Sequence, residues 1–315
     1  KVSVGMVWYL YLSESPVNYP DIEFPKPMLG MAITPKTKAD EDKMSFALQR
    51  VLEEDRSLRL EKNTETKEQI LYAMGDQALD VVCNKLKNKY KVEINLAPYK
   101  IQYRETIRGT VEAEGKHKKQ SGGAGQYGHV WIRFEPCDSE DMVFEEEIFG
   151  GAVPKQYFPA TEQGLRECME KGVLAGYKVV GVKATLFDGS YHDVDSKEIA
   201  FKAAARLAYK AGMPKAKPIL LEPIGKVTVY VPEEYTGTII GDFNKRRGII
   251  MGMEMTEDNE QKIDAEVPMA EMQKYATELR SMTQGRGYYV IEFDRYEPAP
   301  QPVAEKVIAN PHIED

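Results

Sequence analysis

The feature that most constrains the fold is an order of predicted elements that occurs twice in the 315-residue chain. Apolar periodicity and turn residues predict strand, helix, strand, strand, helix and strand over residues 28–100, and again over 223–300. This βαββαβ order is that of ferredoxin-like domains. We therefore predict an α+β protein, with two ferredoxin-like βαββαβ domains that flank a middle α/β domain.

Changes of pattern near Ile101 and Pro223 set the predicted domain limits. At roughly 150 residues per domain, a chain of this length suggests two domains, or three small ones. The prolines before residue 28 and after residue 297 indicate irregular ends. We predict a linker or remnant of a preceding domain at 1–27, ferredoxin-like domains at 28–100 and 223–300, a middle domain at 101–222 and a tail at 301–315.

Charge and cysteine usage argue against several classes of protein. The net charge of -8 is unfavourable for indiscriminate nucleic-acid binding, although a local RNA contact in the nearly neutral middle third stays open. No apolar run approaches the ~20 residues needed to span a bilayer. The three cysteines lie far apart, which disfavours a disulfide framework or a zinc site. We expect a cytoplasmic monomer without a membrane partner.

Two polar stretches of the middle domain are the candidate binding site. Residues 115–128 form a basic, glycine-rich loop between predicted strands, and lysines, glycine amides and Tyr127 suit phosphate contact and base stacking. Residues 189–196 lie between a predicted strand and a predicted helix, whose N-cap we assign to Asp195. A solvated hairpin and a plain strand-to-helix turn explain the same residues, so composition leaves the choice open.

The sequence does not favour catalysis. Gly109 and Gly115 lack the P-loop spacing, and His117 stands where Ser or Thr is needed. His192 next to Asp193 could suggest acid–base chemistry, but no nucleophile and no metal-ligand spacing accompanies the pair. We predict no catalytic residue and no metal ligand. The cations at 244–248 could complement a helix dipole or meet phosphate.

Several long, ordered segments resemble bacterial translation elongation factor G. The similarity covers about residues 24–308 and corresponds to the C-terminal half of that family, domains III, IV and V. It implies that the middle domain is domain IV, with a ribosomal-protein-like βαβ fold. The segments are Ile33-Thr-Pro-Lys-Thr-Lys-Ala-Asp40, Tyr103-Arg-Glu-Thr106, Gln120-Ser-Gly-Gly-Ala-Gly-Gln-Tyr-Gly-His129, Gly189-Ser-Tyr-His-Asp-Val-Asp-Ser196, Leu220-Leu-Glu-Pro-Ile224, 237–247 and 271–286.

The resemblance implies a function in protein synthesis. In that family the two polar loops form the tip of domain IV, which enters the A site at the decoding centre and promotes GTP-dependent movement of tRNA and mRNA. The implied partners are ribosomal RNA, A-site tRNA and mRNA. GTP and magnesium would belong to a GTPase domain outside this chain. The implied RNA-contacting residues are Lys118, Ser121, Gly122, Gly123, Gly125, Gln126, Tyr127, Gly128, Ser190, Tyr191, His192 and Asp193.

Alternatives of function stay open at this point. Where the family usually has Gly-Glu-Leu-His-Leu-Asp, residues 75–80 are Gly-Asp-Gln-Ala-Leu-Asp, without the histidine. A paralogue that recycles or protects ribosomes is therefore an alternative. A free-standing RNA-binding protein is another, but the chain lacks the aromatic run of RNA-recognition domains.

Because the chain has no P-loop, we predict that it does not bind GTP. Isothermal calorimetry with GTP and magnesium should give no heat of binding. Saturable binding that survives repurification of the chain would contradict the prediction.

Overall fold

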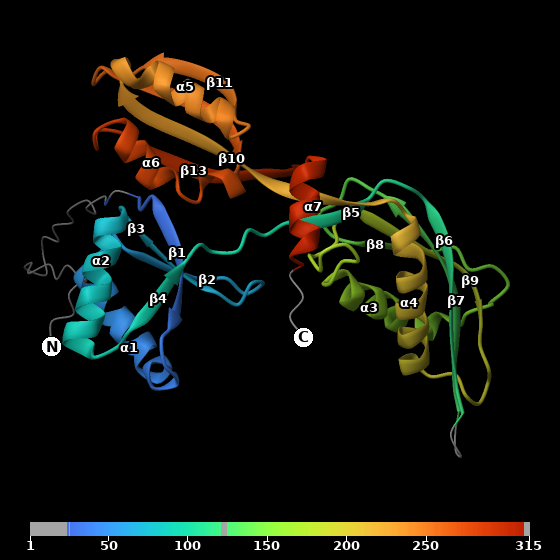
Figure 1. The fold of residues 1–315 in the computed structure, drawn as a ribbon. Helices are drawn as coiled ribbons and strands as arrows, with labels where there is room; N and C mark the ends of the chain where they lie inside the picture. Colours follow the sequence, from blue (N-terminus) through green and yellow to red (C-terminus); the bar gives the residue numbers. More distant parts are fainter. Residues whose placement is uncertain (1–23, 25, 121–124, 312–315) are drawn as a thin grey trace, which may run out of the picture. The chain divides into compact units, whose positions relative to one another are not determined.

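The computed structural model describes residues 24, 26–120 and 125–311 (Figure 1). The chain forms two compact units. The first combines residues up to 101 with 223–295, and the second combines 102–222 with the residues from 296 onward.

The first predicted ferredoxin-like segment is confirmed. Its antiparallel sheet has the order β2-β3-β1-β4, so the first strand lies in the interior of the sheet. The apolar face of its first helix is buried, as the spacing predicts. The elements are β1 (Leu29–Pro35), α1 (Lys38–Glu54), β2 (Arg59–Lys62), β3 (Gln69–Ala73), α2 (Asp76–Lys85), a π-helical turn (Leu86–Tyr90) and β4 (Ile94–Ala97).

The second segment repeats this topology, with the sheet order β11-β12-β10-β13. Short 3-10 turns precede both of its helices, at positions where Pro232 and Pro268 end a strand. The elements are β10 (Pro218–Pro232), α5 (Thr236–Lys245), β11 (Ile249–Met255), β12 (Glu260–Pro268), α6 (Tyr275–Met282) and β13 (Tyr288–Pro298).

The middle segment builds a sheet of order β6-β7-β9-β8, in which β8 and β9 are parallel and joined through α3. This β8–α3–β9 connection is the expected βαβ unit. α4 packs against β6, β7 and α3, so both helices cover one face of the sheet (Figure 1). The elements are β5 (Arg104–Ile107), β6 (Val111–Lys119), β7 (Gln126–Pro136), β8 (Val143–Glu146), α3 (Phe158–Met169), β9 (Val182–Ser190) and α4 (Glu198–Gly212).

The observed units differ from the predicted domain scheme. The chain divides next to residues 101 and 222, but both ferredoxin-like segments lie in one unit. β10 also runs without interruption through 222–223, pairing with β5 first and with β12 afterwards. Part of the expected tail is the helix α7 (Gln301–Ala309). Most of the expected linker at 1–27 lies outside the described residues. The three-domain division stays a prediction.

A buried carboxylate organises the loop between α3 and β9. The Glu105 side chain lies on β5, and the residue is 1% exposed. Its two oxygens accept hydrogen bonds from the backbone N–H groups of Leu174, Ala175 and Tyr177, at 2.8, 2.8 and 3.1 Å. These donors replace the water that a carboxylate loses on burial, which makes its burial tolerable.

We predict that Glu105→Ala destabilises the middle unit by about 3 kcal/mol or more, because three enclosed N–H groups lose their acceptor. Chemical denaturation should show the loss. The matched control is Glu146→Ala on β8, whose exposed carboxylate should contribute within ~0.5 kcal/mol. Equal unfolding midpoints for the two variants would contradict the role of Glu105.

Candidate nucleic-acid interface

The glycine-rich stretch is mostly a β-hairpin, not a flexible loop. β6 and β7 pair in register from Val111↔Phe134 to Lys119↔Gln126. The connection between them is therefore 120–125, much shorter than the expected loop 115–128. Of the predicted RNA-contacting residues in this stretch, Ser121, Gly122 and Gly123 lie outside the described residues.

Two of the glycines allow the hairpin to approach α4 closely. A Cβ atom on Gly128 would lie 2.5 Å from the carbonyl group of Ala200, and one on Gly115 would meet the carbonyl oxygen of Ala204. Real Cβ atoms are not found so close to backbone atoms. The structure thus gives Gly128 a packing role on the buried face of the sheet, whereas an RNA contact by Gly128 stays a prediction.

Backbone and side-chain hydrogen bonds join the two predicted loops. Ser196 Oγ donates to the Tyr127 carbonyl oxygen and accepts from the His192 N–H, both at 2.9 Å. The Tyr127 N–H donates to the Asp195 carbonyl oxygen at 3.0 Å. Residues about seventy positions apart along the chain are therefore held side by side at one end of the middle unit.

The predicted N-cap at Asp195 is wrong. α4 begins at Glu198, and its N-cap residue is Lys197, whose side chain makes no capping bond. The Asp195 carboxylate instead accepts the Gly125 N–H at 3.0 Å, across the two loops. The Asp-x-x-Glu spacing is compatible with either arrangement, and the proximity of Gly125 decides between them.

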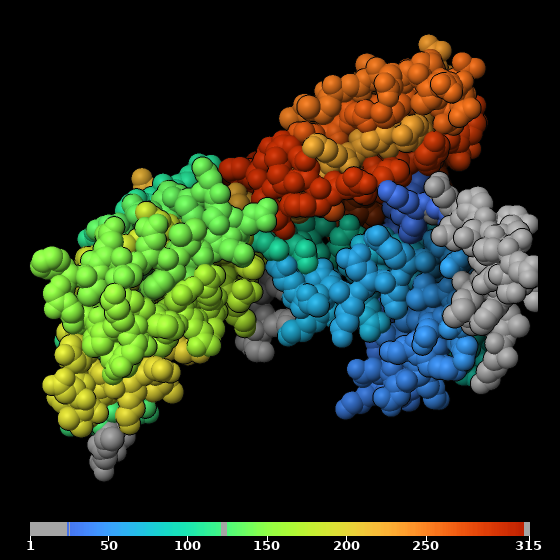
Figure 2. Space-filling view, turned by 180° about the vertical axis from the view of Figure 1, so that it is seen from behind, coloured from blue at the N-terminus to red at the C-terminus, as the bar shows by residue number. Residues whose placement is uncertain are grey.

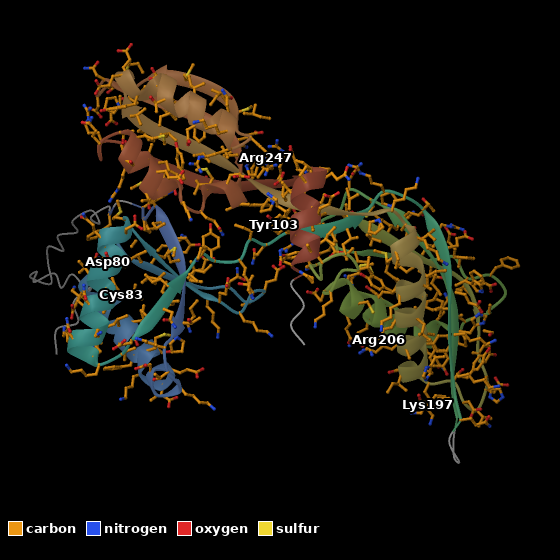
Figure 3. The ribbon with its side chains drawn as sticks, viewed as in Figure 1. Asp80, Cys83, Tyr103, Lys197, Arg206 and Arg247 are labelled. Atoms are coloured by element: carbon orange, nitrogen blue, oxygen red, sulfur yellow. The ribbon has the colours of Figure 1, made fainter. Side chains whose placement is uncertain are left out.

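Several predicted residues face solvent at this end of the unit. Lys118, Tyr191, His192 and Asp193 are exposed, whereas Gln126, Tyr127 and Ser190 are half-buried. The space-filling view shows the yellow surface of α4 and the residues just before it at the lower end of the middle unit (Figure 2). Lys197 lies at the end of α4 nearest the hairpin (Figure 3). We call this part of the middle unit, formed by 116–120, 125–129 and 190–197, the tip.

The His192 ring is oriented by its own loop. Its Nδ1 atom lies 3.3 Å from the backbone nitrogens of both Val194 and Asp195, and 3.7 Å from the Asp195 carboxylate. The two contacts demand opposite protonation of Nδ1. We assign Nδ1 as the acceptor, since the amides are nearer and the carboxylate already holds Gly125. The proton then sits on Nε2 of a side chain that is 57% exposed.

Sequence reasoning missed His129 of the tip and Glu114 next to it. His129 lies 2.8 Å from Ser190 and 2.9 Å from Glu114, measured between the hydrogen-bonding atoms. β7 and β9 bring His129 and Ser190 directly opposite each other in the sheet. Polar residues alternate with other residues along β6 and β7. This alternation is the one local pattern that indicates such a cross-strand cluster.

The arginines after α5 form ion pairs within the first unit. Arg246 bonds to Asp242 at 2.6 Å and pairs with Glu278, and its guanidinium lies 4.9 Å from the Tyr275 ring centre. Arg247 pairs with Glu271 at 3.4 Å. These partners favour a structural role for the basic run over a phosphate contact.

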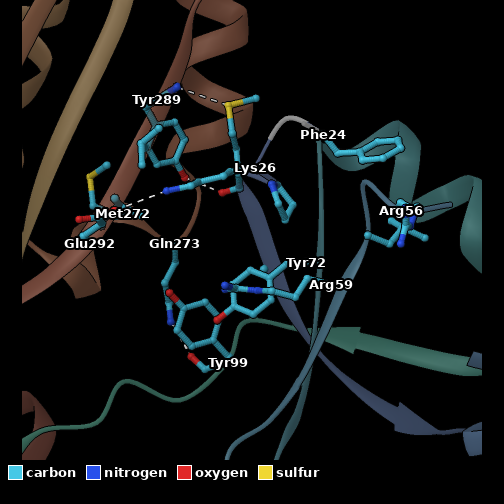
Figure 4. Close-up of a pocket in the computed structure, with 16 residues that line it drawn as sticks. Phe24, Lys26, Arg56, Arg59, Tyr72, Tyr99, Met272, Gln273, Tyr289 and Glu292 are labelled. Atoms are coloured by element: carbon cyan, nitrogen blue, oxygen red, sulfur yellow. Dashed lines mark hydrogen bonds and ion pairs between the residues drawn. The ribbon is translucent and has the colours of Figure 1, made fainter. Parts of the chain in front are cut away.

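The first unit contains a pocket of about 480 Å³ that holds none of the described candidate residues (Figure 4). Tyr72, Tyr99 and Tyr289 contribute to its lining, and burial raises the pKa of Tyr99 to about 12. Arg59 stacks on Tyr72, with 4.3 Å from the guanidinium carbon to the ring centre.

In the described part of the chain, no group of acidic, histidine and cysteine side chains is arranged to hold a metal ion. Its helices are also too short or too polar to cross a membrane.

Three family models match consecutive parts of the chain. Elongation Factor G, domain III matches residues 24–98, elongation factor G, domain IV matches 99–217, and the elongation factor G C-terminus matches 219–307. Together they cover nearly all the described residues. The chain belongs to the elongation factor G family. The tip lies entirely within the domain IV match.

A crystal structure of a protein from Thermus thermophilus is similar to this elongation factor G chain. The TM-score is 0.83 and the sequence identity is 41%, over 94% of this chain and 45% of the other. The chain thus spans less than half of the length of that relative. The matched family models are those of domains III, IV and the C-terminus.

We predict that Gly128→Ala lowers the free energy of unfolding of the middle unit by about 1–3 kcal/mol, since the hairpin must move away from α4. The control is Gly237→Ala on α5, where a Cβ atom has open space and alanine should stabilise the helix by about 0.5–1 kcal/mol. Denaturant titration of both variants measures the difference. A Gly128→Ala protein as stable as the parent would contradict the packing role.

Proposed function

We propose that this chain is the C-terminal portion of a ribosomal translocase of the elongation factor G type. In this proposal, the complete protein promotes GTP-dependent movement of tRNA and mRNA, and the tip of domain IV acts at the decoding centre. Its partners are ribosomal RNA, A-site tRNA and mRNA. The matches to consecutive domains of one family support this function.

The observation that carries the proposal is the joining of the two loops at the tip. The Asp195 carboxylate accepts a hydrogen bond from the Gly125 N–H, and the Ser196 hydroxyl donates one to the Tyr127 carbonyl oxygen. Exposed polar and aromatic side chains project from the loops that these bonds join. A surface that contacts a moving RNA duplex needs such internal hydrogen bonds, because a flexible loop would not keep its side chains in the geometry that the contact requires.

The chemistry of the tip suits RNA contact by shape and stacking. Tyr127 and His192 place their ring centres 6.5 Å apart, and the Lys116 ammonium lies 6.0 Å from the Tyr127 ring centre. Aromatic faces and cations of this kind contact unstacked bases and phosphates. Exposed Glu114 and Asp193 reduce the local positive charge, so nonspecific attraction to phosphate stays weak.

The mechanism we infer is mechanical. GTP and magnesium would be bound by a GTPase domain of the complete protein, and the residues of this chain would transmit the resulting movement. The tip would then stabilise the advanced position of the tRNA. Preferential contact with that position lowers the barrier, whereas equal contact with both positions would not.

We predict that His192→Ala slows translocation by about 5- to 150-fold, which corresponds to the loss of ~1–3 kcal/mol from one stacking or hydrogen-bonding contact. The exposed side chain contributes little to the fold, so stability should change by no more than ~0.5 kcal/mol. Rapid-kinetic translocation by the complete protein on programmed ribosomes measures the rate.

The control for this experiment is Leu207→Ala, an exposed position farther along α4 that should leave the rate unchanged. GTP turnover should stay the same in both variants. A wild-type rate for His192→Ala would argue against the proposed role of the tip. If the complete protein splits or protects ribosomes and does not translocate, one of the paralogue alternatives replaces the translocase.

A further inference from the structure

A chain of three hydrogen bonds crosses the sheet next to the tip. The Tyr127 hydroxyl lies 2.8 Å from Ser190 Oγ, Ser190 Oγ lies 2.8 Å from His129 Nδ1, and His129 Nε2 lies 2.9 Å from Glu114 Oε1. The four residues come from three neighbouring strands, β6, β7 and β9. We call this chain of bonds the relay.

The strand register explains how the four side chains meet. His129 pairs with Ser190 on β9 and with Lys116 on β6. Tyr127 is two positions from His129 along β7, and Glu114 is two positions from Lys116 along β6. All four side chains therefore lie on one face of the sheet. Gly115 and Gly128 contact α4 from the other face.

The carboxylate at one end sets the direction of every bond in the relay. An ionised carboxylate only accepts hydrogen bonds, so His129 must carry its proton on Nε2. A neutral imidazole protonated there has a bare Nδ1, which accepts the Ser190 hydroxyl proton. Ser190 Oγ then accepts the Tyr127 hydroxyl proton. The Tyr127 oxygen is left with lone pairs, so toward any ligand it can accept but not donate.

The enclosed His129 ring restrains the relay, whereas Glu114 at its end is 47% exposed. The His129 side chain is 15% exposed, and both of its nitrogens are bonded. Removing one partner would leave a largely enclosed polar atom unsatisfied, which costs more than the net value of the bond. The Tyr127 side chain, next to His192 and Lys116, is thereby held in one orientation.

The relay is not what holds the hairpin together. Backbone pairing extends from Val111 to Lys119, and Val130, Ile132 and Phe134 are fully buried on the helix side. These contacts supply the stability of the strands, since burial of large apolar side chains is the main favourable contribution to folding. Loss of the relay should therefore change the orientation of Tyr127 more than the fold.

We propose that Glu114, His129 and Ser190 are positioning residues, which orient Tyr127 so that its ring stacks on RNA and its oxygen accepts a hydrogen bond from RNA. This inference rests on the proposed function, because it assigns roles within the same tip. The donor on RNA is a ribose 2′-hydroxyl or an exocyclic base amine.

The direction of the relay can be measured in the intact protein by nitrogen NMR of labelled histidines. His129 should be the neutral tautomer protonated on Nε2, and Glu114→Gln should shift its signals toward a mixture of tautomers. Phe149→Ala, at an exposed position of the same unit, should leave the signals unchanged. An Nδ1-protonated or doubly protonated His129 at neutral pH overturns the proposal.

The positioning role can be measured by a kinetic double-mutant cycle. Ser190→Ala removes the bond between Tyr127 and Ser190 and should slow translocation about fivefold, with GTP turnover unchanged. Tyr127→Phe also removes the acceptor oxygen and should slow translocation at least as much, and the double variant should be no slower than Tyr127→Phe. Ser190→Thr keeps a hydroxyl and should restore the rate. The relay is overturned if the decreases in translocation rate of the two single variants multiply in the double variant. It is also overturned if Ser190→Thr does not restore the rate.

Altered mRNA identifies the donor on RNA. Replacing 2′-hydroxyls of the A-site codon with hydrogen should slow the parent protein and leave Tyr127→Phe unaffected if ribose is the donor. If the base is the donor, codon bases that lack the exocyclic amine should slow the parent protein and leave Tyr127→Phe unaffected. If neither substitution distinguishes the two proteins, the acceptor role of Tyr127 is wrong. If His192→Ala slows translocation but the losses of the two single variants multiply in the double variant, the relay alone is overturned. If all tip variants translocate at the wild-type rate, the proposed function and the relay are overturned together.

Discussion

The antiparallel pairing of β7 with β9 is the contact on which the candidate site depends. It sets His129 opposite Ser190 and so brings together two segments that are about sixty residues apart. Once this register is fixed, the loop after β9 must pass beside the end of the hairpin, where Asp195 and Ser196 bond to it. A slip of β9 by one residue would turn its side chains, Ser190 among them, to the opposite face of the sheet.

The two faces of this sheet have different duties. The helix side is apolar and so close to α4 that Gly115 and Gly128 cannot carry a Cβ atom. The other side carries Glu114, Tyr127 and His129, whose polar atoms bond to each other and to Ser190. Close packing on one face and directional hydrogen bonds on the other restrain the hairpin in complementary ways.

Local patterns were sufficient to predict most helices and strands. The spacing of Met44, Ala47, Leu48 and Val51 places one face of α1 in the core, and this face is buried. The glycine-rich stretch was harder, because glycine permits both a flexible loop and close packing. Only the nearness of the α4 backbone distinguishes these uses at Gly128. β5 and β6, which follow each other along the chain, belong to different sheets, since β5 pairs with β10 and β6 with β7.

The sequence by itself determined the two βαββαβ segments and singled out two polar loops as the candidate site, and its resemblance to elongation factor G implied the βαβ connection. These features depend on residue periodicity and on motifs that are continuous along the chain. The tertiary structure decided how the tip is assembled, that Asp195 holds Gly125 and does not cap α4, and which residues orient Tyr127. Those contacts join residues that are distant in sequence. Their partners are set by strand register and close packing, which no local pattern specifies.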